Sequence, residues 1–400
     1  MSNPSNMGSS PRKMRHNNVV AALKVLFEQG RLSRAELARS LGLNRSSSGN
    51  IVSQMAANSL VREVADDAGD RSKRAGRPGI FLELNPQSAY FVGAEIGVEH
   101  ITTLHVDLMA NLAAFQVEPF DGRSVSAASA VELAIAQAFG DLPPEIADRV
   151  EGFGLSTPAQ MDRNGKVSIA PLLGWQDVDL HELTRNALGG SMPIEIENDA
   201  NAFAFGESYR DRNAKAGVTL VLVIETGVGG GIVIDGKVFR GGHGLAGEIG
   251  HLVLPDSTEL EQVLGLEFLL RSHKSQMELT ETSLAQFLAD VRDRVPAAVM
   301  IAEDWARHLA LALVAACRVM DPDRVVLGGS TSALYPLVSA RVAHHISANQ
   351  AVTFPLPNIT VHDAAETGAA FGAACMMHRR FLSFEDRALF EPSDDPAPGS

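Results

Sequence analysis

The sequence predicts a mixed α/β protein with a small, mainly helical unit at its N-terminus. Apolar residues recur at helical spacing in several short segments of residues 17–64, and turn residues separate these segments. After residue 86, short β-rich runs alternate with helical stretches, which is typical of α/β domains. Basic side chains are concentrated in residues 1–82, which hold 13 Lys and Arg against 6 Asp and Glu, while the remainder holds 21 against 42.

Length and composition narrow the class of protein. A chain of 400 residues, 45% hydrophobic and 20% charged, is expected to form more than one globular domain. The N-terminus lacks a secretory pattern, and the longest apolar run, Leu309–Ala316, is much shorter than a membrane span. Only Cys317 and Cys375 are present, so a disulfide framework is excluded. We expect a cytoplasmic protein with no membrane partner.

The N-terminal unit shows clear helix signals. Helical periodicity starts at Asn17 and ends at Gly30. Ser33, with Glu36 three residues later, forms the pattern of a capping box for a second helix. Asn44 is a typical N-cap for a third helix.

Two strands are expected to follow these helices. One begins at Leu60 and the other covers Ile80–Leu84, and a polar loop joins them. Short helices followed by a two-stranded ribbon indicate a winged helix-turn-helix over residues 16–85. Residues 1–15 are rich in Ser, Asn and Pro and are expected to be a disordered tail.

This unit has the chemistry of a DNA-binding module. In a helix-turn-helix, the N-terminal side chains of the second helix of the pair reach base edges, and basic neighbours contact phosphates. The candidate DNA contacts are Arg34, Arg45, Ser46, Asn50, Arg74 and Arg77. Ser48 and Gly49 make the reading helix atypical, because an aliphatic residue packs better than Ser and Gly weakens a helix. A protein-binding winged helix, or a basic tail that is only solvated, remains an alternative.

The body carries several separated motifs that resemble one known family. They are Gly152–Pro158, Gly174-Trp175, Glu197–Ala202, Thr226–Gly231 and Gly241–His251, preceded by Leu32–Ala38 and Gly76–Pro78 in the basic unit. Together they resemble the ROK family of repressors and sugar kinases. The resemblance implies a two-lobed actin-like ATPase fold, also called ribonuclease H-like, as a sensor domain over residues 86–385. The boundary between the lobes is expected near residue 205, with the C-terminal helix returning to the first lobe and a disordered tail at residues 386–400.

The resemblance also implies a sugar pocket, because sugar hydroxyls are bound by carboxylates and amides. The implied ligand residues are Asn198, Asp199, Glu248, His251 and Glu267. Asp199 matches the residue that acts as the catalytic base in kinase members. From the residues alone, a strand-end turn and helix cap is the favoured interpretation of Asn198 and Asp199.

The phosphate loops depart from the kinase pattern. Where the family has Asp-x-Gly-Gly-Thr, this chain has Glu95-Ile96-Gly97-Val98-Glu99, which adds bulk and a negative charge. Glu225 adds a second acid before the next glycine loop. Because a carboxylate repels phosphate when no metal lies between them, both changes argue against ATP. We expect no catalytic residue and no cofactor.

The zinc motif implied by the resemblance is also incomplete. His251 is retained, but no Cys follows it through Glu267. Structural zinc needs about four nitrogen or sulfur ligands, so no structural metal is expected.

The sequence therefore predicts a DNA-binding transcription regulator, a repressor of carbohydrate-use genes, with a sugar or sugar derivative as effector. Operator DNA is the expected macromolecular partner, and a homodimer or homotetramer is the expected assembly. Two alternatives stay open: an ATP-dependent sugar kinase with a DNA-binding arm, and a regulator controlled by a protein partner.

Overall fold

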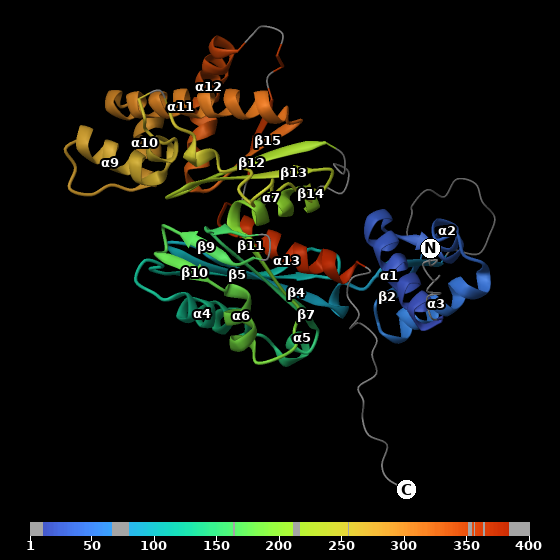
Figure 1. Ribbon diagram of the computed structural model, residues 1–400. Helices are drawn as coiled ribbons and strands as arrows, with labels where there is room; N and C mark the ends of the chain where they lie inside the picture. The colour runs from blue at the N-terminus through green and yellow to red at the C-terminus, as the bar shows by residue number, and fades with distance from the viewer. Residues whose placement is uncertain are drawn as a thin grey trace, which may run out of the picture.

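The computed structural model describes residues 11–65, 80–162, 165–210, 217–254, 256–350, 354–355, 357–362 and 365–383. A winged helix unit lies beside the first of two α/β lobes, and the second lobe lies above the first (Figure 1). The architecture is the α/β arrangement that the sequence predicts.

The N-terminal unit packs helices against a small antiparallel sheet. Its elements are α1 (Pro11–Gln29), α2 (Arg34–Ser40), α3 (Arg45–Ala57), β1 (Leu32–Ser33), β2 (Val61–Ala65) and β3 (Ile80–Leu84). The capping box is confirmed, because Ser33 and Glu36 exchange hydrogen bonds of 3.2 and 2.8 Å between backbone N–H and side-chain oxygen. Asn44 caps α3 by accepting from the Ser47 N–H at 2.9 Å.

Two expectations for this unit need correction. Helix α1 begins at Pro11, so the predicted disordered tail is wrong for residues 11–15. Proline is tolerated in a first helical turn, and the Arg, Lys and Met residues that follow are good helix formers. The sheet order is β1-β3-β2, so the predicted two-stranded ribbon gains a third strand.

The first lobe is built on a mixed sheet with the order β11-β7-β4-β5-β6. Its strands are β4 (Tyr90–Ile96), β5 (His100–Asp107), β6 (Leu112–Pro119), β7 (Val150–Thr157) and β11 (Ile194–Asn198). Helices α4 (Ala127–Phe139) and α6 (Leu180–Leu188) cover one face, and α13 (Gly368–Phe381) covers the other (Figure 1). Smaller elements are η1 (Pro86–Ser88), α5 (Pro144–Ala147), β8 (Gln160–Met161), β9 (Val167–Ala170) and β10 (Trp175–Val178).

The second lobe has a sheet of the order β14-β13-β12-β15-β16. Its strands are β12 (Val218–Ile224), β13 (Val228–Ile234), β14 (Lys237–Val238), β15 (Arg324–Gly328) and β16 (Asn358–Val361). Its helices are η2 (Ile249–His251), α8 (Glu261–Leu264), α9 (Leu266–Gln276), α10 (Leu284–Arg292), α11 (Pro296–Met320), η3 (Ser330–Leu334) and α12 (Tyr335–Asn349). The short η4 (Ala365–Thr367) precedes α13 and contacts β5 of the first lobe. Trp305 is fully buried in its core and donates to the Leu264 carbonyl at 3.0 Å.

Helix α7 (Asp199–Arg210) lies against α13 between the two sheets (Figure 1). The two helices approach closely because small residues face each other. A Cβ atom added at Gly372 would lie 1.7 Å from the Ala202 carbonyl oxygen. Glycine is therefore required there, and the close fit fixes α7 firmly against the first lobe.

The winged helix unit and the first lobe share one apolar core. Phe27 of α1 stacks on Tyr209 of α7, with ring centroids 5.5 Å apart, and lies 4.7 Å from the ring of His378 in α13. His378 is fully buried and forms hydrogen bonds to the Tyr209 hydroxyl at 2.7 Å and the Leu108 carbonyl at 2.8 Å. The N-terminal unit is thus joined to the body by packed side chains, beyond its covalent link.

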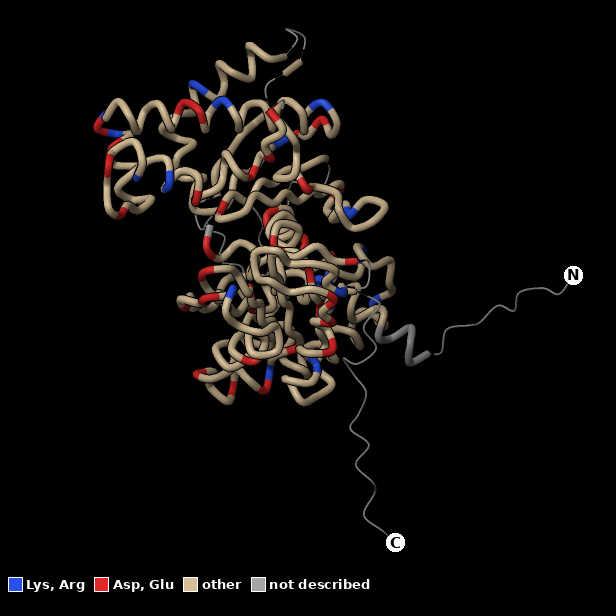
Figure 2. Tube along the Cα trace, turned by 60° about the vertical axis from the view of Figure 1, so that its left-hand side comes forward, with Lys and Arg blue, Asp and Glu red and all other residues tan. Residues whose placement is uncertain are grey.

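The described helices include none that is both long enough and apolar enough to cross a bilayer. Acidic residues occur across both lobes of the body in Figure 2.

Candidate functional sites

The exposed face of α3 carries the side chains predicted to read DNA. Arg45 is the first residue of the helix, and Arg45, Ser46 and Asn50 are all exposed. The opposite face is buried through Ser48, Ile51, Val52 and Met55. This division leaves the N-terminal turns of α3 free to enter a groove, as a recognition helix does.

The flanking residue Arg34 is held by an exposed ion pair. Arg34 lies 2.5 Å from Glu63, and both side chains are about half exposed. Such pairs contribute little to stability, so Arg34 can exchange its carboxylate partner for a phosphate at small cost. Arg74 and Arg77 lie outside the described residues.

A cavity of about 190 Å³ lies between the lobes and contains four of the five predicted sugar ligands. Asn198 ends β11, Asp199 begins α7, and Glu248 and His251 come from the segment after β14. Glu267 is not among them. It lies at the start of α9 and lines a separate cavity with Arg271 and Lys274.

Asp199 is under opposing electrostatic influences. Burial raises its pKa to about 6, the Ala200 backbone N–H opposes this rise, and the Glu248 and Glu225 carboxylates add to it. The positive end of α7 favours the charged form, but it does not outweigh burial among other acids. Asp199 is therefore a carboxyl group that changes protonation near neutral pH.

Asn198 performs the structural role that its residue type suggested. Its side-chain oxygen accepts from the Asn201 N–H at 3.1 Å, which caps α7, and its amide donates to the Ala159 carbonyl at 3.2 Å. It also lines the cleft. Asn198 therefore both caps α7 and lines the cleft, so a ligand that contacts Asn198 would act directly on α7.

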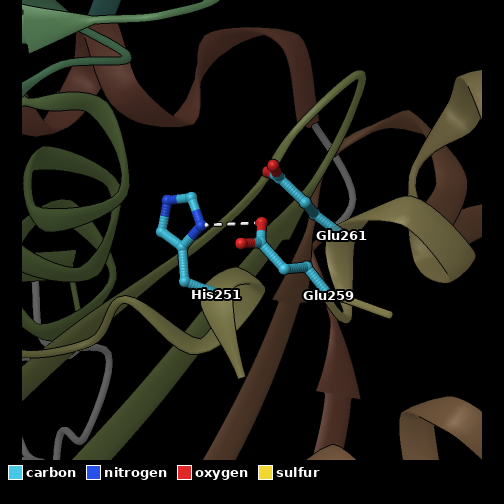
Figure 3. Close-up of side chains that lie close together, drawn as sticks. All are labelled: His251, Glu259 and Glu261. Atoms are coloured by element: carbon cyan, nitrogen blue, oxygen red, sulfur yellow. Dashed lines mark hydrogen bonds and ion pairs between the residues drawn. The ribbon is translucent and has the colours of Figure 1, made fainter. Parts of the chain in front are cut away.

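His251 lies among carboxylates (Figure 3). Its Nδ1 atom is 3.2 Å from Glu259, and its Nε2 atom is 3.8 Å from Glu248. Partial burial acts to lower the pKa of His251, but Glu259, Glu261 and Glu248 outweigh it and raise the value. In the family motif, the loop after this histidine carries a cysteine cluster. In this chain, glutamate side chains connect the loop to His251 instead.

The loops that resemble phosphate-binding loops are filled by their own carboxylates. Glu225 accepts from both the N–H and the hydroxyl of Ser330 at 2.6 Å, at the start of η3. Glu99 accepts from the Thr226 hydroxyl at 3.3 Å and so joins the two loops. These donors are the type that would bind a phosphate oxygen. In this arrangement, carboxylates of the protein already occupy both sets of donors.

Glu95 adds to this concentration of acids. Desolvation raises its pKa well above the ordinary value, and the Asp199 and Glu225 carboxylates raise it further. Burial raises the pKa of Glu225 as well, although its two bonds from Ser330 oppose the rise. A cleft lined in this way favours neutral hydroxyl donors over anions.

Sequence reasoning missed several residues of the site. Ser330 lies 105 residues from Glu225, and nothing near either residue signals the pairing. Arg240 forms an ion pair with the buried Glu197 carboxylate. The Glu-Asn-Asp-Ala-Asn motif contained Glu197 and Asn201, so their position in a functional motif was the one available signal.

Comparison with known proteins places this geometry in context. The model of the ROK family matches residues 91–380. The xylose repressor of Bacillus subtilis is 28% identical over 232 residues, which is 58% of this chain and 59% of that protein. The chain thus matches about three fifths of that relative's length. A putative xylose repressor of a Caldicellulosiruptor strain is 24% identical and aligns over 92% of this chain and 97% of its own length.

Solved structures show the same fold. A ROK family transcriptional regulator, described as a homolog of the Escherichia coli Mlc protein, has a TM-score of 0.73 at 19% identity, covering 92% of this chain and 97% of that one. A ROK glucokinase from Streptomyces griseus, in complex with glucose and AMPPNP, has a TM-score of 0.63 at 23% identity, covering 72% and 99%. The sequence resemblance is confirmed, and the chain belongs to the ROK family.

Proposed function

We propose that this protein is a sequence-specific transcription regulator, acting as a repressor whose operator affinity is set by a sugar in the cleft. One observation carries the proposal. Helix α7 begins with Asp199 in the cleft and ends beside Tyr209, which stacks on Phe27 of the winged helix unit. A single helix therefore connects a polar ligand cavity with the module that presents α3.

The DNA side rests on charge and exposure. The basic residues are concentrated in the N-terminal segment, and Arg45 and Asn50 are exposed on one face of α3. Arginine can pair with guanine and asparagine with adenine in a major groove. Relatives named as repressors of the same family agree with this reading.

The effector is a neutral sugar or sugar derivative. The cleft offers the Asp199, Glu248 and Asn198 side chains as partners for hydroxyl groups. Xylose is the first candidate, since the relatives are named xylose repressors. By linkage, a sugar that lowers operator affinity must itself bind the DNA-bound protein less tightly.

A kinase activity is disfavoured even though relatives include a glucokinase. Glu225 occupies the Ser330 donors, and Glu99 joins the loops that would otherwise receive phosphates. We infer that the chain has lost phosphoryl transfer. A coupled assay for ADP with Mg²⁺, ATP and a panel of aldoses is expected to show no turnover, and turnover above about 1 s⁻¹ would establish the kinase alternative.

We further propose that a twofold symmetric assembly, a dimer or a tetramer of such dimers, presents two winged helices to a palindromic operator. The half-sites would be one or more helical turns apart. Light scattering on the full chain, with and without operator DNA, tests this assembly.

The central test is DNA selection from a random pool with the full chain. A discrete motif is expected, and Arg45→Ala is expected to reduce discrimination at one position by about 1–3 kcal/mol. Arg307→Ala, on the exposed face of α11, is the matched control and should leave selection unchanged. Recovery of no motif by the wild-type chain would reject the proposed function.

A further inference from the structure

A second cavity, of about 270 Å³, adjoins the sugar cleft along β11. It shares the lining residues Ala159, Asn198 and Glu248 with the cleft, so the two spaces meet at these residues. None of the other predicted sugar ligands lines it. Its remaining walls come from β8, the start of α6, Asn201 of α7 and the segment 240–246.

Asn201 gives this cavity an acceptor without a partner. Its side chain is only 4% exposed, yet its Oδ1 atom is one of the few buried side-chain atoms of the described residues that lack a hydrogen bond. Its amide nitrogen is already held by Glu197 at 3.2 Å. A buried polar atom that is left without a hydrogen bond lowers stability, because it has lost its contact with water. A donor on a ligand in the cavity would remove that cost.

The surrounding groups are fixed in place. Glu197 is 6% exposed and accepts from Asn201, from the Asn198 N–H at 3.0 Å and from Arg240. A side chain with so many partners keeps one orientation, and it holds the Asn201 amide in place where Asn201 lines the cavity. The site is therefore preorganised before any ligand binds.

The charge of the walls selects the class of ligand. Among the described residues of its lining, acidic side chains outnumber basic ones: Asp162, Glu195, Glu197 and Glu248 face His181 and one Arg, which Glu197 already binds. A phosphate or carboxylate would meet repulsion. A neutral polyol supplies hydroxyl donors for the Asn201 oxygen and the carboxylates.

Size restricts the ligand further. Pockets for drug-sized molecules have volumes of about 300–1,000 Å³, so a cavity of about 270 Å³ suits a single sugar ring. We propose that this cavity is a subsite for a second sugar unit, and that the effector is a disaccharide with one ring in the cleft and one beside Asn201. The inference rests on the proposed function, because it takes the cleft as the first sugar site.

Calorimetric titration of the full chain with matched sugars tests the proposal. The probes are xylose and xylobiose, glucose, cellobiose and maltose. At least one disaccharide is expected to bind 10-fold or more tightly than its own monosaccharide. Asn201→Ala, and Ala246→Leu as a variant that fills the cavity, should each reduce that ratio to near one. Asn186→Ala, an exposed change on α6 away from the cavity, should preserve it.

The possible outcomes distinguish failure of the second sugar site from failure of the proposed function. Monosaccharide binding without any gain from a second ring overturns the subsite and leaves the sugar-controlled regulator standing. A gain that survives in both cavity variants also overturns the subsite. Absence of binding by every sugar rejects both claims. Circular dichroism of each variant identifies a loss of ratio that comes from misfolding.

Discussion

At Asp199, helix position and surroundings act in opposite directions. The first turn of α7 favours a charged carboxylate, but burial beside Glu248 and Glu225 raises the pKa to about 6. The folded protein therefore holds a proton that the unfolded chain releases between about pH 4 and pH 6. Stability falls as pH rises through this window, because the native state binds more protons there.

The variant Asp199→Asn removes this penalty while keeping the shape of the side chain. At pH 7.5 we expect a gain of unfolding free energy on the order of 2–3 kcal/mol, and below about pH 4 no difference from the wild type. Urea denaturation across pH 3.5–8 measures it. The exposed Asp141→Asn is the control. Equal stability of Asp199→Asn and wild type at pH 7.5 would contradict the raised pKa.

Gly49 gives a second prediction at this scale. It lies inside α3, and a Cβ atom added there would meet nothing within 4 Å. Gly49→Ala should therefore stabilise the protein by about 1 kcal/mol. Ala56→Gly, the reverse change at an exposed position of α3, should lower the free energy of unfolding by a similar amount. A lower operator affinity of the stabilised Gly49→Ala variant would indicate that the backbone of α3 approaches DNA at this residue. If Gly49→Ala does not increase the free energy of unfolding, the argument from helix propensity is refuted.

At the scale of elements, α7 links the two ends of the proposed regulation. Its 12 residues span roughly 18 Å. At the far end of α7, Tyr209 contacts His378 of α13. The Nε2 atom of His378 donates to the Leu108 carbonyl, and its Nδ1 atom accepts from the Tyr209 hydroxyl. A shift of α7 on ligand binding would have to disturb this buried contact and the Phe27 ring beside it.

Tyr209→Phe is the variant that weakens this connection. It removes the hydroxyl that hydrogen-bonds to the Nδ1 atom of His378 and should lower the free energy of unfolding by about 1–3 kcal/mol. The ratio of operator affinities without and with sugar should move toward one, as followed by fluorescence anisotropy. Tyr335→Phe, in α12 of the second lobe, is the matched control. A wild-type sugar response in Tyr209→Phe would exclude this route.

The phosphate-like loops yield a prediction of gained binding. Wild-type protein should show no thermal shift with Mg²⁺ and AMPPNP. The double variant Glu99→Thr and Glu225→Ala frees the Ser330 and Thr226 donors, and should show a nucleotide-dependent increase in Tm. A clear shift in the wild type would show that the acids do not block nucleotide.

Elements were predictable where the signal is local. Ser33, Glu36 and Asn44 cap helices as their residue types suggest, and the β-rich runs that alternate with helical stretches after residue 86 correctly indicated an α/β body. Strand β6 gives no such signal. It is an edge strand with mostly exposed residues, so it lacks a buried apolar pattern. Short strands such as β1 depend on a partner far along the chain.

Contacts within the site were less predictable, because they join distant segments. The Glu225–Ser330 pair is one example. Glu267 is another: the family pattern implied a cleft residue, but its loop lacks the cysteines that would order it, and its side chain lines another cavity. The periodicity of α1 correctly marked Phe27 as apolar and buried, but periodicity does not show that its neighbours are Tyr209 and His378.

At the scale of the whole molecule, the chain combines a basic N-terminal unit, an acidic body and a continuous core between them. Val19, Leu23 and Phe27 of α1 belong to the same apolar cluster as Phe91 and Phe371 of the body. The predicted domain boundary lies at residue 85, but the apolar core continues across it. The two parts therefore do not pack as separate units.

This shared core has a consequence for the exchange of parts between related regulators. A hybrid made by joining a foreign winged helix at residue 85 would place an unmatched surface of α1 against Tyr209 and His378. Reprogramming the operator while keeping the sensor should instead transplant only the exposed face of α3, leaving α1 native. The same fit would require the contacting residues of α1 and of the body to change together in evolution. The exposed residues of α3, which face DNA in the proposed function, could change independently.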